Sequence, residues 1–408
     1  MIGPLARAAR QATRSFRPLQ LGLIARDLLP PRPSGRSDLE QLRDAIDWLC
    51  LAHDAGGGEG VAAGYYPSHG GWLEPYPETT GYIIPTFLKA RPRLERDDLL
   101  PRAVAMGDWE IREQLPDGAV RGGVGLSGPP IVFNTGQVML GWIALHRETG
   151  EGRFADAALR AGRWLAHVQD ESGAWTRFTH EGVPHAYHTR VAWPVLATAE
   201  MTGDPALKAA GRRHVAWVLD QTGPGGWIRH MGFTEDEAPL THTIAYTLRG
   251  LLECIPHVPE QDGHLILHAV QEACGSIGRL LDRGTDRLAL PGQLAEGWRP
   301  AARYACVTGN AQLAIVFMGL HRLGPDPRWE RAARRLLDDV CARQVGPKGR
   351  PEVRGAVPGS YPCWGRYNPL SFPNWATKFF ADALLDWMER EGAPSRDSVE
   401  GLDGALVG

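Results

Sequence analysis

The chain has 408 residues, a formal net charge of −3 and a pI near 6.5, and 43% of its residues are hydrophobic. This composition is typical of a soluble globular protein with one large domain or two medium ones, and the near-neutral charge argues against a nucleic-acid partner. The sequence contains no apolar run of the roughly 18 residues that a membrane-spanning helix needs.

The six cysteines are scattered along the chain and include no CxxC pair. This spacing offers neither a disulfide framework nor a metal site, and it is typical of reduced thiols. We therefore expect a cytoplasmic protein.

The N-terminal segment, residues 1–36, contains seven arginines and no lysine. No apolar segment with a small-residue cleavage site follows it, so a signal peptide is not expected. We interpret residues 1–36 as a frayed basic arm. The alternative interpretation is a peripheral contact between this arm and a membrane or a partner.

A repeat of about 55 residues follows the arm and is marked by tryptophans. Trp109, Trp164 and Trp217 are each followed by Gln four or five residues later and then by a glycine-rich loop. The stretches QDESGAW (169–175) and QTGPGGW (221–227) show the pattern most clearly. Such internal repetition predicts a repeated supersecondary unit.

Each repeat combines two kinds of helix pattern. An outer helix is apolar on one face, and an inner helix that is apolar almost all round follows the loop. The predicted outer helices lie near 38–54, 98–114, 152–169, 205–221, 262–282 and 326–344, and their inner partners near 79–92, 130–147, 186–201, 240–255, 303–322 and 372–390. Six such pairs predict an all-α (α/α)6 toroid over residues 37–393, followed by a polar tail at 394–408.

In such a ring, every loop from an outer to an inner helix emerges at the same end, so the first turns of the inner helices line one cavity. Polar side chains in these turns are therefore the candidate functional groups, because burying them without partners is costly. We predict four catalytic residues: Glu78, His188, His242 and Tyr246. We predict twelve substrate-binding residues: Trp72, Tyr82, Asn134, Gln137, Tyr187, Arg190, Asn310, Gln312, Trp364, Arg366, Trp375 and Lys378.

Structural roles are the alternative for several of these residues. Asn134 and Asn374 could be helix caps, and a carboxylate in a first turn, such as Glu78, is stabilised by the helix dipole without any catalysis. His242 and Tyr246 are four residues apart, so both lie on one helical face. The pair His185 and His188 lacks the carboxylates of a zinc motif, and GGVGLSGPP (122–130) lacks the lysine of a P-loop. We predict no metal and no cofactor.

The Gln/Trp repeats resemble those of squalene and oxidosqualene cyclases, although the acidic DxDD signature of those cyclases is absent. The chain also resembles, over most of its length, a family of bacterial toroid proteins associated with polysaccharide biosynthesis. That resemblance rests on EPYPETTGYIIPTFL, LTHTIAYTLRGLLE, VTGNAQLAIVF and FPNWATKFFADALL. In architecture the chain is similar to uronate-acting toroids, namely glucuronyl C5-epimerases, polysaccharide lyases and unsaturated-glucuronyl hydrolases. These resemblances imply an oligosaccharide or polysaccharide substrate.

The cavity residues favour proton transfer at the carbon next to a uronate carboxylate. Histidine and tyrosine can move the proton, while arginine or lysine can hold the carboxylate. The outcome would be C5 epimerisation or β-elimination. One alternative is a glycoside hydrolase that uses Glu78 and a second carboxylate. The other alternative is a glycan-binding scaffold without catalysis.

Overall fold

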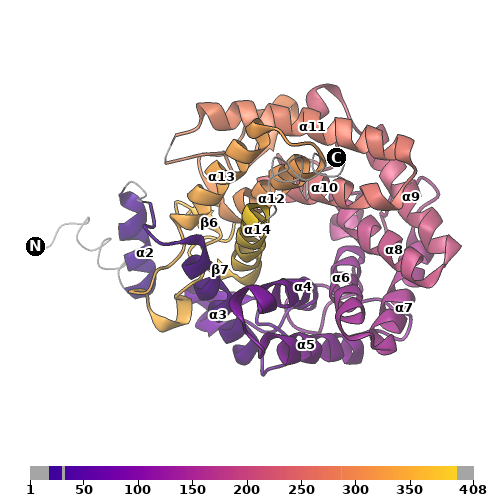
Figure 1. Ribbon diagram of the computed structural model, residues 1–408, viewed down its shortest axis with the longest axis horizontal. Coiled ribbons are helices and arrows are strands. Elements are labelled where there is room, and N and C mark those ends of the chain that lie inside the picture. The colour runs from indigo at the N-terminus through magenta and orange to yellow at the C-terminus, as the bar shows by residue number, and fades with distance from the viewer. Residues whose placement is uncertain (1–17, 30–32, 286, 393–408) are drawn as a thin grey trace, which may run out of the picture.

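Two concentric sets of six helices form a ring in the computed structural model, which describes residues 18–29, 33–285 and 287–392 (Figure 1). The outer helices of this described part are α3 (Asp38–Ala55), α5 (Leu99–Glu113), α7 (Gly152–Val168), α9 (Pro205–Asp220), α11 (Glu260–Arg283) and α13 (Pro327–Cys341). The inner helices are α4 (Pro77–Leu94), α6 (Val132–Thr149), α8 (Thr189–Thr202), α10 (Thr241–Cys254), α12 (Val307–Leu323) and α14 (Asn374–Gly392). The fold is the predicted (α/α)6 toroid.

The burial pattern explains why each helix takes its layer. On α7 the apolar side chains from Phe154 to Val168 form one buried face, whereas Arg153, Arg160 and Arg163 lie on the opposite face. On the inner helix α12, nearly every side chain from Val307 to Leu320 is buried. A helix without a polar face is stable only when other helices surround it, so the inner ring forms the core.

The ring is closed by contact between its last and first units. Each inner helix packs against the next in chain order, and α14 packs against both α3 and α4. Glycines allow these close approaches: an added Cβ at Gly136 would lie 2.9 Å from a Val191 methyl group, and one at Gly81 would lie 2.4 Å from the Cα of Val138. The inner helices therefore form a continuous barrel wall.

The glutamine of the sequence repeat joins neighbouring outer helices. Gln169 donates from Nε2 to the carbonyl oxygens of Gly173 and of Ala210 on α9, each at 3.0 Å. Gln114 makes the equivalent two bonds one unit earlier. Gln344 donates to the carbonyl oxygens of Gln41 on α3 and of Gly355 in its own loop, so the same pair of hydrogen bonds joins the last unit to the first.

The structure also explains why these loops contain a glycine. Gly118, Gly173 and Gly355 have positive φ angles of 98°, 90° and 86°. A Cβ at each position would lie within 2.5 Å of a carbonyl oxygen on the next outer helix. Glycine is thus required by both the backbone conformation and the close contact.

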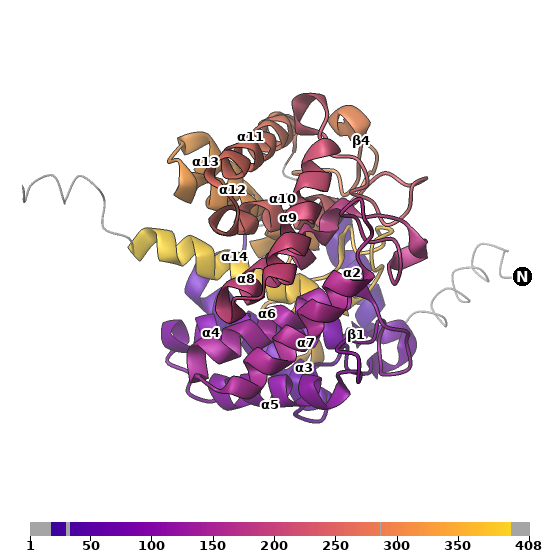
Figure 2. The ribbon, with the colours of Figure 1, turned by 90° about the vertical axis from the view of Figure 1, so that its right-hand side faces the viewer.

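The loops from outer to inner helices gather on one side of the ring, on the right in Figure 2, and the C-terminal end of α14 projects from the other side. They contain short strands: β1 (Gly64–Tyr66), β2 (Gly71–Trp72), β3 (Leu294–Ala295), β4 (Arg299–Pro300), β5 (Ala305–Cys306), β6 (Ser360–Tyr361) and β7 (Phe372–Pro373). β1 pairs antiparallel with β7, with Tyr65 opposite Phe372, so the first and last loops are also joined. The sequence analysis did not predict these strands.

The N-terminal segment differs from the expected frayed arm. Residues 18–28 form helix α2 (Pro18–Leu28), which is held on the ring by buried polar contacts. Asp27 is 1% exposed and accepts a hydrogen bond of 2.7 Å from the backbone N–H of Cys363. Arg287 donates to the carbonyl of Asp27 at 3.3 Å. This part of the arm therefore contacts the ring itself, while residues 1–17 and 30–32 lie outside the described residues.

The predicted helix boundaries hold to within a few residues, with two larger differences. The third inner helix begins at Thr189, after a 3-10 turn at Ala186–His188, and the fifth begins at Val307, after β5. None of the described helices is both long and apolar enough to cross a bilayer. The predicted tail at 394–408 lies outside the described residues.

Candidate active site

A cavity of about 790 Å3 lies where the inner helices begin, and we call it the N-terminal cavity. Its walls come from the first turns of α4, α6, α10 and α14 and from the 3-10 turn before α8, together with loop residues. Eight residues named in the sequence analysis line it: Glu78, Tyr82, Asn134, Tyr187, His188, His242, Tyr246 and Trp375. The expected convergence of first turns at one end of the ring is therefore present for five of the six units in the described chain.

Glu78 is an unusually basic carboxylate in this cavity. It occupies the second position of α4, directly after Pro77, which is well suited to a first helical turn. The phenol of Tyr76 donates a short hydrogen bond to Glu78 Oε2. Burial raises the pKa of Glu78 to about 7, although this hydrogen bond and the charge of Arg190 act in the opposite direction. Near neutral pH this group can therefore either donate or accept a proton.

His242 is a neutral imidazole with a defined tautomer. Its Nδ1 lies 3.2 Å from Gln312 Oε1, and because an amide oxygen can only accept, Nδ1 carries the proton. Nε2 therefore has the free lone pair of a base. Burial lowers the pKa of His242 to about 3, and the charge of Arg190 acts in the same direction. Gln312, predicted to bind substrate, instead orients the imidazole.

Tyr246 lies one helical turn after His242, and their ring centroids are 4.4 Å apart. Burial, followed by the nearby charge of Glu78, raises the pKa of Tyr246 far above its usual value. Its phenol therefore stays protonated and can donate a hydrogen bond to a developing negative charge. Tyr82 and Tyr187 are also buried in the walls and have raised pKa values for the same main reason.

Arg190 lies in the first turn of α8 and is buried, with 1% of its surface exposed. Its Nε and Nη2 donate to Gln137 Oε1 at 3.2 and 3.0 Å, and its guanidinium lies 5.5 Å from the centre of the Tyr246 ring. Gln137 in turn donates to the Arg190 carbonyl at 3.1 Å. Gln137 thus fixes the guanidinium whose charge acts on Glu78 and His242.

His188 is held among aromatic rings. The rings of Phe133, Tyr187 and Trp175 lie 5.1 to 6.2 Å from its imidazole, and neither ring nitrogen has a hydrogen-bond partner among the described residues. Burial lowers its pKa well below the usual value. His188 is therefore a neutral wall residue that could contribute to catalysis only if a ligand approaches one of these nitrogens.

Several predicted substrate-binding residues face away from the N-terminal cavity. Asn310 donates to Asp339 on the outer helix α13 at 2.9 Å, so it joins two helices. Lys378 lies 2.5 Å from Asp382 and faces the other end of the ring. Asn374, considered as a cap, donates to the Ala62 carbonyl at 2.9 Å and has a structural role.

Three more predicted residues lie in loops outside the cavity lining. Trp72 is in β2 and packs between Trp48 and Tyr65, with centroid distances of 5.4 Å to each. Trp364 is 43% exposed and Arg366 is exposed. The sequence places all three before an inner helix, but none of them is in the lining of the cavity, whereas Tyr367 and Asn368 from the loop of Trp364 and Arg366 are.

Sequence reasoning did not select four residues that line the cavity: Phe133, Phe233, Tyr367 and Asn368. His180 and Glu237, which the sequence offers as loop residues at this end of the ring, also line it. The ring of Tyr367 is tilted against that of His242, with centroids 5.5 Å apart, and its hydroxyl accepts a hydrogen bond of 2.7 Å from Trp375 Nε1. Phe133 has the apolar character of a core residue. Only the wider aromatic content of these loops offered a signal for them.

No three histidine, cysteine or carboxylate side chains are grouped as metal ligands within the described parts of the chain. The described cysteines are unpaired and buried.

Comparison with known proteins shows similarity of structure without similarity of sequence. No protein-family model and no curated protein sequence matches the chain. A crystal structure of an unsaturated glucuronyl hydrolase specific for heparin has a TM-score of 0.67 at 12% identity, covering 87% of this chain and 98% of that one.

Two further solved structures are similar over a comparable length. A mutant unsaturated glucuronyl hydrolase from Streptococcus agalactiae, complexed with dGlcA-GalNAc6S, has a TM-score of 0.62 at 12% identity, covering 85% of this chain and 90% of that one. A sugar epimerase from a ruminal bacterium has a TM-score of 0.64 at 11% identity, covering 88% and 100%. At this identity the likeness establishes the shared toroid fold.

Proposed function

We propose that the protein is an enzyme that acts on a uronic-acid-containing glycan by proton transfer at the carbon next to the carboxylate. The observation that carries the proposal is the position of two proton carriers across the ring. Glu78 begins α4, the first inner helix, and His242 begins α10, the fourth of six, so the two helices face each other across the ring centre (Figure 1). A sugar in the N-terminal cavity would lie between them.

The chemistry requires one base and one acid on opposite sides of the sugar. Nε2 of His242 would take the C5 proton, and the C–H electron pair would move into the carboxylate as an enolate. Tyr246 would donate a hydrogen bond to that enolate, and the buried charge of Arg190 would stabilise it. Protonated Glu78 would then deliver a proton to the other face of C5, which gives the C5 epimer. Expulsion of the C4 oxygen substituent instead gives a C4–C5 double bond.

Only some of the cations that the sequence analysis expected to bind the substrate carboxylate lie near the N-terminal cavity. Arg366 lies outside the cavity lining and Lys378 faces the other end of the ring. Arg190 is the cation whose charge lowers the pKa of Glu78. Asn134 and Tyr187 offer uncharged hydrogen-bonding groups on the cavity wall. Arg190 is buried and is not in the lining of this cavity, so we assign carboxylate recognition to these neutral donors, with the charge of Arg190 acting at a distance.

Glycoside hydrolysis is the second candidate, and the raised pKa of Glu78 favours it. A protonated carboxyl is the usual acid for cleaving a glycosidic bond, and Glu237 on the cavity rim offers a second carboxylate. The two unsaturated glucuronyl hydrolases among the compared structures agree with this alternative.

Incubation of uronate-containing glycans with the protein in D2O separates the candidates. Deuterium at C5 without chain cleavage supports an epimerase, and a new unsaturated uronate supports a lyase. New reducing ends without either product indicate hydrolysis and contradict the proposal. Binding with no chemical change across a panel of glycans indicates a scaffold and contradicts any enzyme.

His242→Gln and Glu78→Gln test the assigned roles, and Glu74→Gln is the matched control because Glu74 is exposed and outside the cavity lining. Loss of a positioned acid or base costs about 100- to 10,000-fold in rate. We expect losses of this size for the two cavity variants and none for the control. Unchanged activity in either cavity variant would contradict its role.

A further inference from the structure

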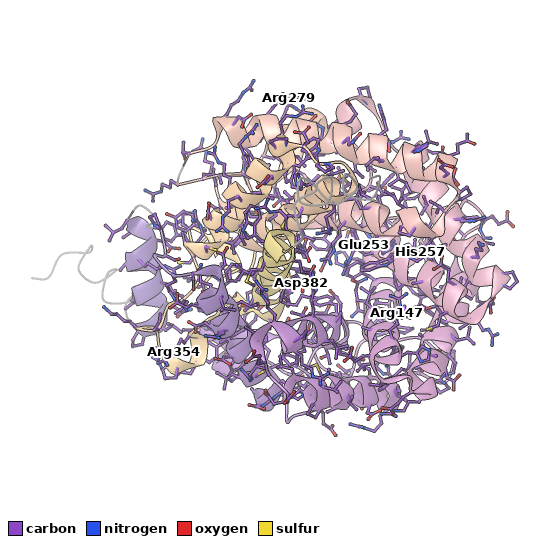
Figure 3. The ribbon with its side chains drawn as sticks, in the orientation of Figure 1. Arg147, Glu253, His257, Arg279, Arg354 and Asp382 are labelled. Atoms are coloured by element: carbon purple, nitrogen blue, oxygen red, sulfur yellow. The ribbon has the colours of Figure 1, made fainter. Side chains whose placement is uncertain are left out.

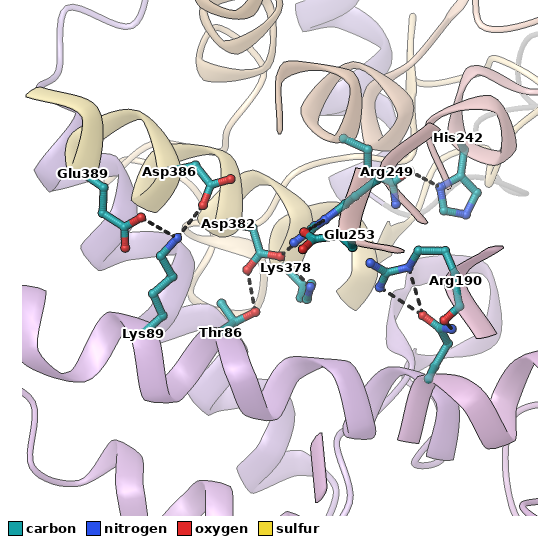
Figure 4. A network of polar contacts seen from close by, with 12 residues as sticks. Thr86, Lys89, Arg190, His242, Arg249, Glu253, Lys378, Asp382, Asp386 and Glu389 are labelled. Atoms are coloured by element: carbon teal, nitrogen blue, oxygen red, sulfur yellow. Dashed lines mark hydrogen bonds and ion pairs between the residues drawn. The ribbon is translucent and has the colours of Figure 1, made fainter. Parts of the chain in front are cut away.

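A second cavity, of about 180 Å3, lies toward the C-terminal ends of the inner helices, and we call it the C-terminal cavity. Charged side chains from α4, α6, α8, α10 and α14 line it. These are Lys89, Arg147, Arg190, Arg249, Lys378, Asp382 and Asp386. Figure 3 shows Arg147 and Asp382 near the ring centre, and Figure 4 shows Lys89, Lys378 and Arg249 in contact with carboxylates and Arg190 in contact with Gln137. The proposed catalytic groups leave this cavity unexplained.

Cations outnumber carboxylates in this lining, five to two. Asp382 is shared by Lys378 at 2.5 Å and Arg249 at 3.5 Å. Arg147 makes no ion pair with any described residue. Glu253 and Glu389, outside the lining, pair with Arg249 at 3.5 Å and with Lys89 at 3.0 Å. Arg190 and Arg147 are therefore the lining cations without a carboxylate partner in the described chain, and cations that lack counter-charge repel their neighbours.

Arg190 provides the strongest sign of a missing anion. Gln137 satisfies its Nε and Nη2, but Nη1 is buried and has no hydrogen-bond partner among the described residues. In Figure 4 the Arg190 guanidinium lies beside the network that contains Lys378 and Arg249. A buried guanidinium N–H group without a hydrogen-bond partner carries the full free-energy cost of its desolvation, whereas a hydrogen-bonded one recovers most of it.

We propose that the C-terminal cavity binds one small oxyanion, a carboxylate or a phosphate, through Arg190, Arg249 and Lys378. We propose further that this anion modulates the proton-transfer groups of the N-terminal cavity. The volume is below the roughly 300 Å3 at which pockets begin to accommodate drug-sized ligands, so a single small anion fits better than an extended sugar. Arginine forks are suited to both carboxylate and phosphate.

Arg190 connects the two cavities electrostatically. Its charge lowers the pKa of Glu78, in opposition to burial. An anion on Nη1 would neutralise part of that charge, so it would raise the pKa of Glu78 and keep its proton bound at higher pH. This coupling rests on the proposed function, whereas the binding of the anion does not.

Lys378 makes the binding dependent on pH. Burial lowers its pKa to about 7, with Arg249 and Arg190 adding to the decrease and Asp382 opposing it. The ring of Tyr82 also lies 5.0 Å from its ammonium, and Arg249 connects Asp382 to Glu253. Asp386 pairs with Lys89 further along the network. Because the protonated ammonium attracts an anion, affinity falls as pH rises through about 7.

Calorimetry and thermal unfolding of the full chain without glycan test the binding, with inorganic phosphate, sulfate and free glucuronate as probes at constant ionic strength. We expect saturable binding of at least one probe near one equivalent, with a rise in Tm. Preference for glucuronate indicates that the anion is the carboxylate of a sugar acid. Preference for phosphate indicates that it is inorganic phosphate or the phosphate group of a phosphorylated compound. No saturable binding of any probe would overturn the proposal.

Arg249→Met removes one of the proposed ligands and should weaken binding by about 30-fold or more. Arg354→Met is the matched control, because Arg354 is exposed and outside the cavity. Equal affinity in Arg249→Met and wild type would overturn the assignment. If Arg249→Met does not fold, Lys378→Met provides the test, since Lys378 is another of the proposed ligands.

The coupling has its own readout, which requires no activity. The carboxyl carbon of Glu78, labelled with 13C and assigned by its loss in Glu78→Gln, can be titrated with and without the bound anion. We expect the pKa of Glu78 to rise on saturation. An unchanged pKa at full occupancy would disprove the coupling, even if the binding itself were established.

Discussion

At the scale of single residues, burial gives the proposed acid and base opposite proton affinities. The carboxyl of Glu78 has its pKa raised to about 7, and the imidazole of His242 has its pKa lowered to about 3. Around neutral pH the site therefore contains a carboxyl that can hold its proton and an imidazole that has none. Pairs of groups whose environments separate their pKa values in this way are typical of acid–base catalysis.

This difference predicts a one-sided pH profile. If Glu78 acts as the acid, kcat/KM should fall tenfold per pH unit above about 7, with no matching decrease on the acid side until the protein unfolds. Tyr76→Phe removes the hydrogen bond that lowers the Glu78 pKa, so it should move the decrease to higher pH. A profile that rises through pH 7 would instead make ionised Glu78 the base.

Glu78 also predicts a stability effect that needs no substrate. Its folded pKa is raised above the usual 4.5, so its contribution to stability is present below pH 4.5 and is lost as pH rises through about 7. Glu78→Gln should therefore unfold less readily than wild type at pH 8, by up to about 3 kcal/mol, with a smaller gain at pH 5. Urea unfolding at both pH values measures this difference. An equal effect at both pH values would contradict the buried, raised-pKa carboxyl.

At the scale of the secondary-structure elements, α5 contains one residue that conflicts with its position. Glu110 is fully buried, and neither carboxylate oxygen has a partner among the described residues. The equivalent positions in the next two outer helices are Leu165 and Val218, which are buried and apolar. Glu110 is therefore a carboxyl in a core position, and burial raises its pKa well above the usual value.

Glu110→Leu should stabilise the protein by about 2 kcal/mol, because it removes an unsatisfied buried group and restores the apolar pattern of the repeat. Thermal or urea unfolding measures the gain. Glu113→Leu on the same helix, where the side chain is only partly buried, is the control and should change stability little. A loss of stability in Glu110→Leu would contradict the account of Glu110 as an unsatisfied carboxyl in an apolar position.

The glutamine links between outer helices form another prediction at this scale. Gln169→Ala removes two hydrogen bonds to backbone carbonyls on different elements, so it should cost about 1 to 3 kcal/mol. Gln344→Ala removes the corresponding link at the closure of the ring and should cost a similar amount. A much smaller effect for Gln344→Ala would indicate that the packing of α14 against α3 and α4, together with β1–β7 pairing, closes the ring without this link.

At the scale of the whole molecule, the fold could be predicted well because its signal is repeated. Amphipathic outer helices and apolar inner helices alternate six times in the described chain, and each unit repeats the evidence. The order of outer and inner helices alone also predicts which first turns face the cavity. Helix α2 was missed because its contact with the ring depends on residues such as Cys363, which are far away in sequence.

The candidate site could be predicted only in part. Residues in first turns, such as Glu78 and His242, have positions determined by the helix register. Loop residues such as Trp72 and Tyr367 depend on how each loop folds, and short strands decide this without a strong local pattern. The orienting role of Gln312 also could not be foreseen, because it requires knowing which inner helices are neighbours.

The most direct test of two opposed proton carriers is C5–H exchange measured separately on the two C5 epimers of a uronate glycan in D2O. Wild type should exchange and interconvert both epimers. Glu78→Gln and His242→Gln should each abolish interconversion, and each should leave residual exchange with one epimer, a different one for each variant. Loss of exchange with both epimers in only one variant, or hydrolytic cleavage without exchange or an unsaturated product, would contradict the account.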